Sequence, residues 1–218
     1  DGRDLGAVGQ EVRQLVAKYQ SKLAPGNKLM VQGLVEQLDT TFLRLGIGFV
    51  VALVLVYLLL VVNFQSWTDA AIIVMALPGA ASGILWGLYA THTNFSVPSL
   101  MGAILSLGVA TANSVLVIAF AREEMERGLD SVEAAYQAGR IRLRPVLMTA
   151  LAMIVGMIPM ALGLGEGGEQ NAPLGRAVIG GLAVATAFTL LFVPTVFARL
   201  RQNGLGQAVD PTLEYEAD

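Results

Sequence analysis

The sequence contains no cysteine, and this absence excludes several kinds of site at once. Without thiols the chain has no disulfide framework, no zinc–thiolate site and no cysteine nucleophile, although the redox compartment stays open. Histidine is nearly absent too, because His92 is the only one. It lies in a short polar stretch, where we interpret it as a solvated loop residue.

Charged residues are also scarce. They make up 14% of the 218 residues, against about 25% in ordinary soluble domains. The run from Ala70 to Ala121 contains no Lys, Arg, Asp or Glu. A water-soluble globule of this size would lack polar covering, so the composition predicts an integral membrane protein. A net charge of -3, with no sustained basic face, argues against a nucleic-acid partner.

Apolar segments of membrane length follow one another along the chain. A bilayer core of about 30 Å needs roughly 20 apolar residues in a helix. The clearest segment is Leu45–Phe64, and Pro98 with its polar neighbours divides the long run 70–121 into two. We therefore predict an all-α bundle of five transmembrane helices. The predicted spans cover residues 43–65, 70–91, 97–121, 145–164 and 175–199, and their apolar cores carry no charge.

The arginines predict an orientation, because cytoplasmic connections are enriched in Lys and Arg. Only Arg44 and Arg176 lie near span ends on one side of the predicted bundle. We therefore expect the other side to be cytoplasmic, with the N-terminal segment outside and the C-terminus inside. The arginines of the expected cytoplasmic side are Arg122, Arg127, Arg140, Arg142, Arg144, Arg199 and Arg201.

Three segments lie outside the predicted spans. Residues 1–40 contain apolar residues at helical spacing, followed by a Pro-Gly-Asn turn and a plausible strand at 29–33. This combination indicates a short α/β part of an external domain. Residues 130–139, after the capping residue Asp130, predict a short helix on the cytoplasmic membrane surface or, equally, a solvated loop helix. Residues 201–218 are expected to be a cytoplasmic tail. No signal peptide is visible, and we expect the chain to be part of a longer protein.

Glycine recurs at every fourth position of the second predicted span, at Gly79, Gly83 and Gly87. Such a row leaves a groove along one helix face, so that another backbone can approach closely where lipid provides no hydrophobic drive. Helix packing is our interpretation, and a pore-lining or sliding face is the alternative.

The third predicted span is unusually polar for a membrane helix. Ser106 and Asn113 share one face, with Thr111 and Ser114 beside them. An asparagine in hydrocarbon needs hydrogen-bond partners, so Asn113 is expected to point into the bundle as interhelical glue or as a functional group. Weaker candidates of the same kind on the later spans are Thr149, Thr186 and Thr189.

Motifs of enzymes are missing. The sequence has no HExxH, GxSxG or GxxxxGK pattern and no pair of membrane-embedded carboxylates. Glu166 and Glu169 flank two glycines in a loop, where water can solvate their carboxylates and no special role is needed. We therefore expect neither catalysis nor a cofactor or resident metal.

Four stretches resemble a known family, the resistance-nodulation-division (RND) efflux transporters. The resemblance covers nearly the whole chain and implies the last five of twelve membrane helices, preceded by the end of a periplasmic porter domain at residues 1–40. The stretches are NFQSWTDAAIIVMALPGAASG (63–83), SLGVATANSVLVIAFARE (106–123), AGRIRLRPVLMTALAMIVGMIPMALG (138–163) and GRAVIGGLAVATAFTLLFVPTVF (175–197).

The resemblance also implies a proton relay in the membrane. In the family an aspartate pair in the N-terminal half works with a lysine, an asparagine, a threonine and an arginine of this half. By position these are Asn113, Thr149 and Arg142, whereas Ala112 stands at the usual lysine position. The relay cation expected deep in the membrane is therefore absent from this sequence.

The implied function is proton-driven antiport that exports hydrophobic or amphiphilic compounds, as in multidrug resistance, from the bacterial inner membrane and periplasm. The implied partners are the N-terminal half of the pump, further copies in a homotrimer, a periplasmic adaptor, an outer-membrane channel and the lipid bilayer. Two other classes stay open: an exporter of lipids or other substrates from the same superfamily, and a stand-alone membrane scaffold.

Overall fold

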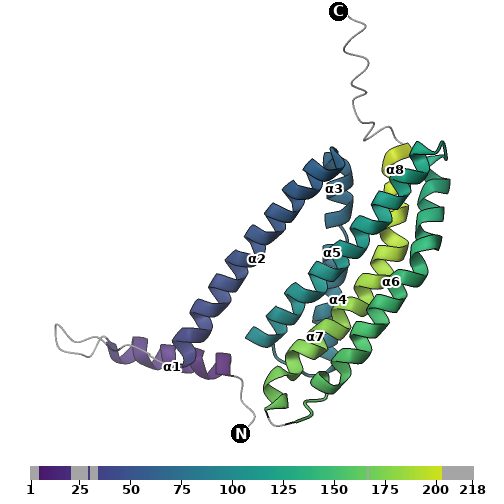
Figure 1. Cartoon of the computed structure of the whole chain (residues 1–218). Helices are drawn as coiled ribbons and strands as arrows, with labels where there is room; N and C mark the ends of the chain where they lie inside the picture. The colour runs from purple at the N-terminus through teal and green to yellow at the C-terminus, as the bar shows by residue number, and fades with distance from the viewer. Residues whose placement is uncertain (1–4, 21–28, 30–33, 166, 203–218) are drawn as a thin grey trace, which may run out of the picture. The chain divides into compact units, whose positions relative to one another are not determined.

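The computed structural model describes residues 5–20, 29, 34–165 and 167–202. Every regular element in this part of the chain is helical (Figure 1). The predicted strand at 29–33 lies almost entirely outside the described residues. The elements are α1 (Leu5–Gln20), α2 (Leu34–Phe64), α3 (Trp67–Val74), α4 (Leu77–Ala90), α5 (Val97–Glu126), α6 (Ser131–Ala161), α7 (Gly168–Ala187), the π-helix η1 (Phe188–Phe192) and α8 (Val193–Gln202).

Five helical segments in the described residues are long and apolar enough to cross a membrane, which confirms the predicted five-helix membrane fold. The protein is a multi-pass membrane protein. Two of the segments combine several elements, because α3 with α4 forms one span and α7, η1 and α8 form another. The segments are Thr40–Phe64, Trp67–Ala90, Val97–Glu126, Ser131–Ala161 and Gly168–Gln202.

The chain forms two compact units, Asp1–Val51 and Ala52–Asp218. In the second unit α7 packs against α4, α5 and α6, and these helices run side by side in Figure 1. One apolar core joins the end of α2 to α3, α5, α6 and α8. Its largest members include Phe64, Ile72, Ile118, Val193 and Phe197.

Prolines explain where the long helical segments change geometry. Pro78 has no N–H to donate to the carbonyl of Val74, so the second span is divided into α3 and α4 at Met75 and Ala76. Pro194 likewise cannot donate to Leu190, and η1 ends just before it. Both spans still continue through the interruption.

Helix α6 differs from the prediction of a surface helix at 130–139 followed by a separate span at 145–164. Residues 131–161 form one continuous helix, which begins after Asp130 although that side chain makes no capping hydrogen bond. The first turns pack inward, because Ala134, Ala135 and Ala138 are buried and small enough to let α8 approach. These first turns therefore pack against α8 and continue without a break into the rest of the membrane-length segment Ser131–Ala161.

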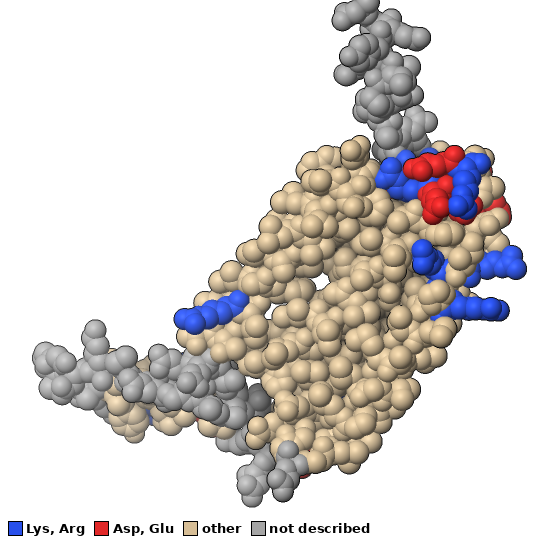
Figure 2. All heavy atoms as spheres, viewed as in Figure 1, with Lys and Arg blue, Asp and Glu red and all other residues tan. Residues whose placement is uncertain are grey.

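Charged side chains of the second unit gather toward the end where α5 stops, α6 begins and α8 finishes (Figure 2). We call this region, from Arg122 to Glu133 together with Arg199 and Arg201, the charged end. The connection between α4 and α5, which contains His92, lies at the opposite end of α5.

Candidate functional site

Two hydroxyl groups meet in the buried centre of the second unit. Ser114 on α5 and Thr189 in η1 are almost completely buried, and their side-chain oxygens lie 3.1 Å apart. The hydroxyl of Ser114 also donates to the carbonyl of Ala110 over 2.8 Å. Because Ser114 has a single hydroxyl proton, Thr189 is the donor in the bond between the two helices. This contact ties α5 to the π-helix.

The expected relay residues lie on α5 and α6. Asn113 is half-buried on α5, next to the exposed Ala112. Thr149 is exposed on α6, and its hydroxyl donates to the carbonyl of Val146 over 3.0 Å. Arg142 is half-buried, and its guanidinium lies 5.0 Å from the centre of the Phe120 ring on α5. Among the described residues, no hydrogen bond joins Asn113, Thr149 and Arg142 to one another.

One face of α5 is uncovered in the second unit. Exposed residues recur along it at spacings of three or four, which places them on one side of the helix. Ala112 belongs to this face, and Asn113 lies at its edge. The face consists of Met101, Leu105, Gly108, Ala112, Leu116 and Ala119.

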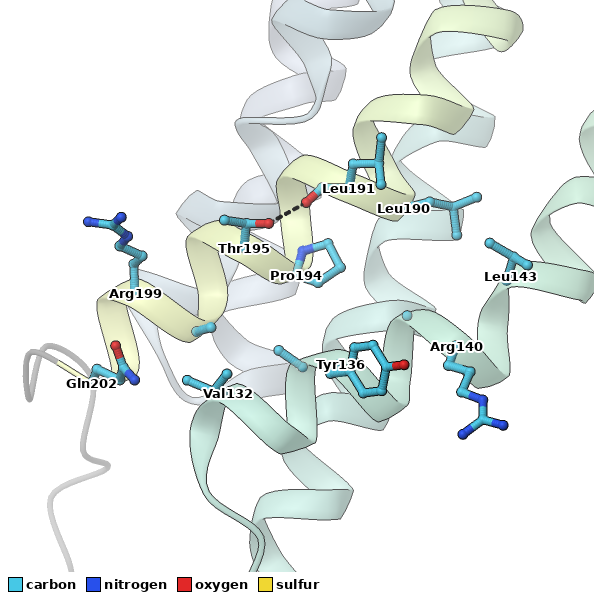
Figure 3. A pocket seen from close by; sticks show the side chains of 13 residues that line it. Val132, Tyr136, Arg140, Leu143, Leu190, Leu191, Pro194, Thr195, Arg199 and Gln202 are labelled. Carbon is cyan, nitrogen blue, oxygen red and sulfur yellow. Dashed lines mark hydrogen bonds between the residues drawn. The ribbon is translucent and has the colours of Figure 1, made fainter.

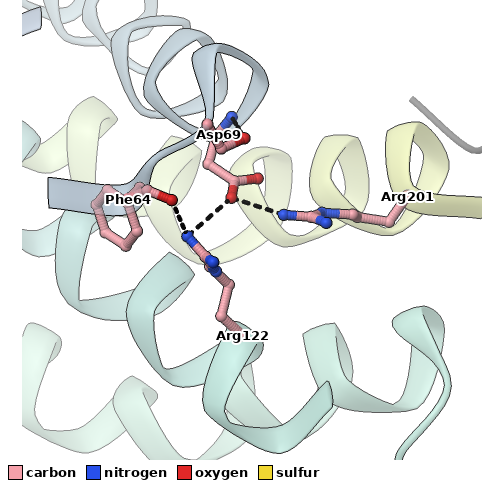
Figure 4. A network of polar contacts seen from close by, with 5 residues as sticks. Phe64, Asp69, Arg122 and Arg201 are labelled. Atoms are coloured by element: carbon pink, nitrogen blue, oxygen red, sulfur yellow. Dashed lines mark hydrogen bonds and ion pairs between the residues drawn. The ribbon is translucent and has the colours of Figure 1, made fainter. Parts of the chain in front are cut away.

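A buried carboxylate joins three helices at the charged end. Asp69 in the first turn of α3 is 0% exposed. Its Oδ2 accepts a hydrogen bond of 2.7 Å from Arg201 on α8 and lies 3.5 Å from Nη1 of Arg122 on α5 (Figure 4). Arg122 also donates to the carbonyl of Phe64, at the end of α2. The carboxylate therefore holds the ends of α3, α5 and α8 together.

Asp69 escaped the sequence prediction because the second span was expected to begin at residue 70. The structure begins α3 at Trp67, where Ser66 is the N-cap and accepts the backbone N–H of Asp69 over 3.2 Å. The signal was present, since Ser66-Trp67-Thr68-Asp69 is a Ser-x-x-Asp pattern directly before an apolar run. Such a pattern marks a helix start, and an acidic residue in a first turn also suits the helix dipole.

The glycine row of α4 lies against α7. A Cβ atom added to Gly83 would stand 2.5 Å from the carbonyl oxygen of Gly180, and one added to Gly87 would stand 2.8 Å from the Cα of Gly180. A Cβ atom on Gly79 would overlap the ring of Phe188. These glycines allow the backbones of α4 and α7 to touch.

Two further residues noted in the sequence, His92 and Glu169, lie in or beside the connections between helices. His92 is exposed in the α4–α5 connection, with a φ of 48°. Glu169 is exposed at the start of α7, and Glu166 lies outside the described residues. Within the described part of the chain, no group of three or more His, Cys, Asp or Glu residues is placed to hold a metal ion.

The family of the protein follows from comparison with known families. Residues 3–201 match the AcrB/AcrD/AcrF family. The chain belongs to this family. The predicted membership of the RND transporters is thereby confirmed.

Two relatives illustrate the range of AcrB/AcrD/AcrF family proteins that resemble this chain. The cobalt-zinc-cadmium resistance protein CzcA of Cupriavidus metallidurans is 36% identical over 90% of this chain and 18% of its own length. The multidrug resistance protein MdtC of Erwinia tasmaniensis is 35% identical over 67% of this chain and 14% of its own length. The chain thus spans less than a fifth of these curated relatives.

A solved structure has a similar fold. The crystal structure of a heavy metal efflux pump (crystal form II) superposes with a TM-score of 0.75 and 32% identity. The match covers 93% of this chain and 20% of the pump chain. The fold of this AcrB/AcrD/AcrF family chain is therefore that of one part of an efflux pump.

Proposed function

We propose that the chain supplies five membrane helices to a proton-driven efflux pump. The observation that carries this proposal is the family match over residues 3–201, which includes four membrane-length segments completely and the fifth up to Arg201. The pump would take its energy from the proton gradient, and the chain would need neither enzymatic activity nor a cofactor.

In this proposal the chain contributes hydrogen-bonding groups to the relay rather than titrating ones. The apolar run 70–121 contains no Asp, Glu, Lys or Arg, whereas proton transfer across a membrane needs groups that titrate. Asn113, at the edge of the uncovered α5 face, would meet carboxylates from the N-terminal half of the pump in this proposal. Ala112 on the same face would offer them no ammonium partner.

The exported substrates are proposed to be hydrophobic or amphiphilic compounds. The multidrug resistance protein MdtC, one of the relatives, supports this class. Metal cations are a second candidate, because CzcA and the heavy metal efflux pump match 90% and 93% of the chain. We further propose a homotrimeric pump in the bacterial inner membrane, with a periplasmic adaptor and an outer-membrane channel as partners.

An export assay in a pump-deficient bacterium tests this function. Cells producing the complete transporter would be loaded with a hydrophobic dye or with zinc, cobalt or cadmium ions, and retention would be followed with and without a protonophore. Protonophore-sensitive export of the dye supports the first substrate class, and export of the ions supports the second.

Two matched variants test whether Asn113 of this chain contributes to the export that the assay measures. Asn113→Ala should slow export, whereas Asn94→Ala, the same change in the exposed α4–α5 connection, should leave it unchanged. Export that persists undiminished with the protonophore would contradict proton coupling. If the cells exported neither the dye nor the metal ions, the result would contradict the pump proposal and favour a scaffold role.

A further inference from the structure

A groove of about 580 Å³ lies between the first half of α6 and the segment formed by η1 and α8 (Figure 3). It exists because the facing side chains are small: a Cβ atom added to Gly139 on α6 would still stand 3.8 Å from the Pro194 ring. Toward the middle of the helices its walls are Leu143, Leu190 and Leu191. The groove is therefore apolar at depth and open to the surroundings of the bundle.

Two arginines flank this groove at different levels, Arg199 toward Gln202 and Arg140 one turn of α6 from Leu143 (Figure 3). Arg140 on α6 and Arg199 on α8 both line it, and both are exposed. Within the described residues neither has a carboxylate partner. Tyr136, 63% exposed between them on α6, adds a phenol to an otherwise apolar wall.

Other arginines near the charged end are already engaged. Arg122 and Arg201 bind Asp69, and Arg127 pairs with Glu123 and Glu124 at 2.7 Å each. Of the other arginines of α6 and α8, Arg140 and Arg199 line the groove, whereas Arg142 lies against Phe120 and Arg144 is exposed outside the groove.

We propose that the groove binds an anionic phospholipid of the surrounding bilayer, with an acyl chain along Leu143, Leu190 and Leu191 and the phosphate at the level of Tyr136, between Arg140 and Arg199. The groove lies on two membrane-spanning segments, Ser131–Ala161 and Gly168–Gln202. A ligand that fills it must be apolar toward the bilayer centre and negative toward the charged end. A phospholipid such as phosphatidylglycerol has both properties, and arginines between membrane helices attract such headgroups.

Lipid titration of the full chain, purified in detergent, tests the proposal. Binding of dioleoylphosphatidylglycerol and of dioleoylphosphatidylcholine would be measured by mass spectrometry of the intact complexes. We expect the double variant Arg140→Gln/Arg199→Gln to lower the association constant for phosphatidylglycerol about tenfold. Arg144→Gln is the matched control, because Arg144 is exposed on α6 but does not line the groove.

A second variant addresses the acyl-chain part of the groove. Thr195→Trp places a bulky ring in the groove and should reduce binding of both lipids, since Thr195 is an exposed lining residue. Equal binding of the two lipids by the native chain would overturn the proposal. So would an equal loss of phosphatidylglycerol binding in Arg144→Gln and in the double variant.

The C-terminal segment of the chain is the competing occupant. Residues 203–218 contain four acidic residues and follow directly on Gln202, which lines the groove. Their conversion to Asn and Gln in the full chain should leave phosphatidylglycerol binding unchanged. Binding that occurs only after this conversion would assign the groove to the segment and overturn the lipid proposal.

Discussion

Arg201 donates a hydrogen bond of 2.7 Å to Asp69, a residue 132 positions earlier in the chain. Removing the negative charge by Asp69→Asn leaves Arg201 and Arg122 facing a neutral group inside the protein. Breaking a buried ion pair from one side costs about 3–5 kcal/mol, so we expect the unfolding free energy in mixed micelles to fall by about this amount.

The control for this prediction is Glu123→Gln. Glu123 also forms a 2.7 Å ion pair, with Arg127, but both side chains are more than half exposed. An exposed pair contributes about 0–1 kcal/mol, so this variant should retain nearly all of the stability. Similar losses in the two variants would show that Asp69 does not hold the helix ends together.

The contact between α4 and α7 leaves no room for a methyl group at Gly83. Gly83→Ala should lower the unfolding free energy by about 1–3 kcal/mol, because its Cβ would lie 2.5 Å from the Gly180 carbonyl oxygen. Gly156→Ala makes the same change in α6 with nothing within 4 Å. It should be neutral or stabilising, and equal unfolding free energies for the two variants would contradict the close packing.

Hydropathy was sufficient to predict five spans, because the bilayer imposes a minimum apolar length on every one. Hydropathy alone could not reveal the interruption at Met75 or the π-helix before Pro194, because both are located at carbonyls that Pro78 and Pro194 leave without a backbone donor. The charge of Asp69 was visible in the sequence, but its pairing with Arg201 depends on the three-dimensional arrangement. Asn113 was identified by its polarity, whereas its proposed role in a relay requires carboxylates that this chain does not supply in its apolar run 70–121.

The proposed orientation predicts that the two ends of α5 lie on opposite sides of the membrane. The chain has no native cysteine, so single cysteines report without background. Asn94→Cys and Glu126→Cys are both exposed and avoid Gly128, whose φ of 97° disfavours a side chain. An impermeant maleimide applied to whole cells should label the first and not the second. Labelling of both from outside, or of Glu126→Cys alone, would contradict the orientation.

Ala112→Lys tests whether the pump works without the lysine that the family usually carries. The added ammonium would fix a charge on the uncovered α5 face, so we expect the complete transporter to export several times more slowly. Ala112→Leu adds bulk without charge and should retain most of the activity. Faster proton-driven export by Ala112→Lys would show that the relay still requires the lysine.

Substrate-dependent proton flux tests the central claim most directly. The complete transporter and this chain alone, each shown to be helical by circular dichroism, would be reconstituted into liposomes that contain a pH-sensitive dye and carry an imposed pH gradient. We expect the substrate to accelerate proton flux with the complete transporter, more weakly with Asn113→Ala, and not at all with the chain alone. A substrate-dependent flux through the chain alone, or export by the complete transporter without proton movement, would contradict this expectation.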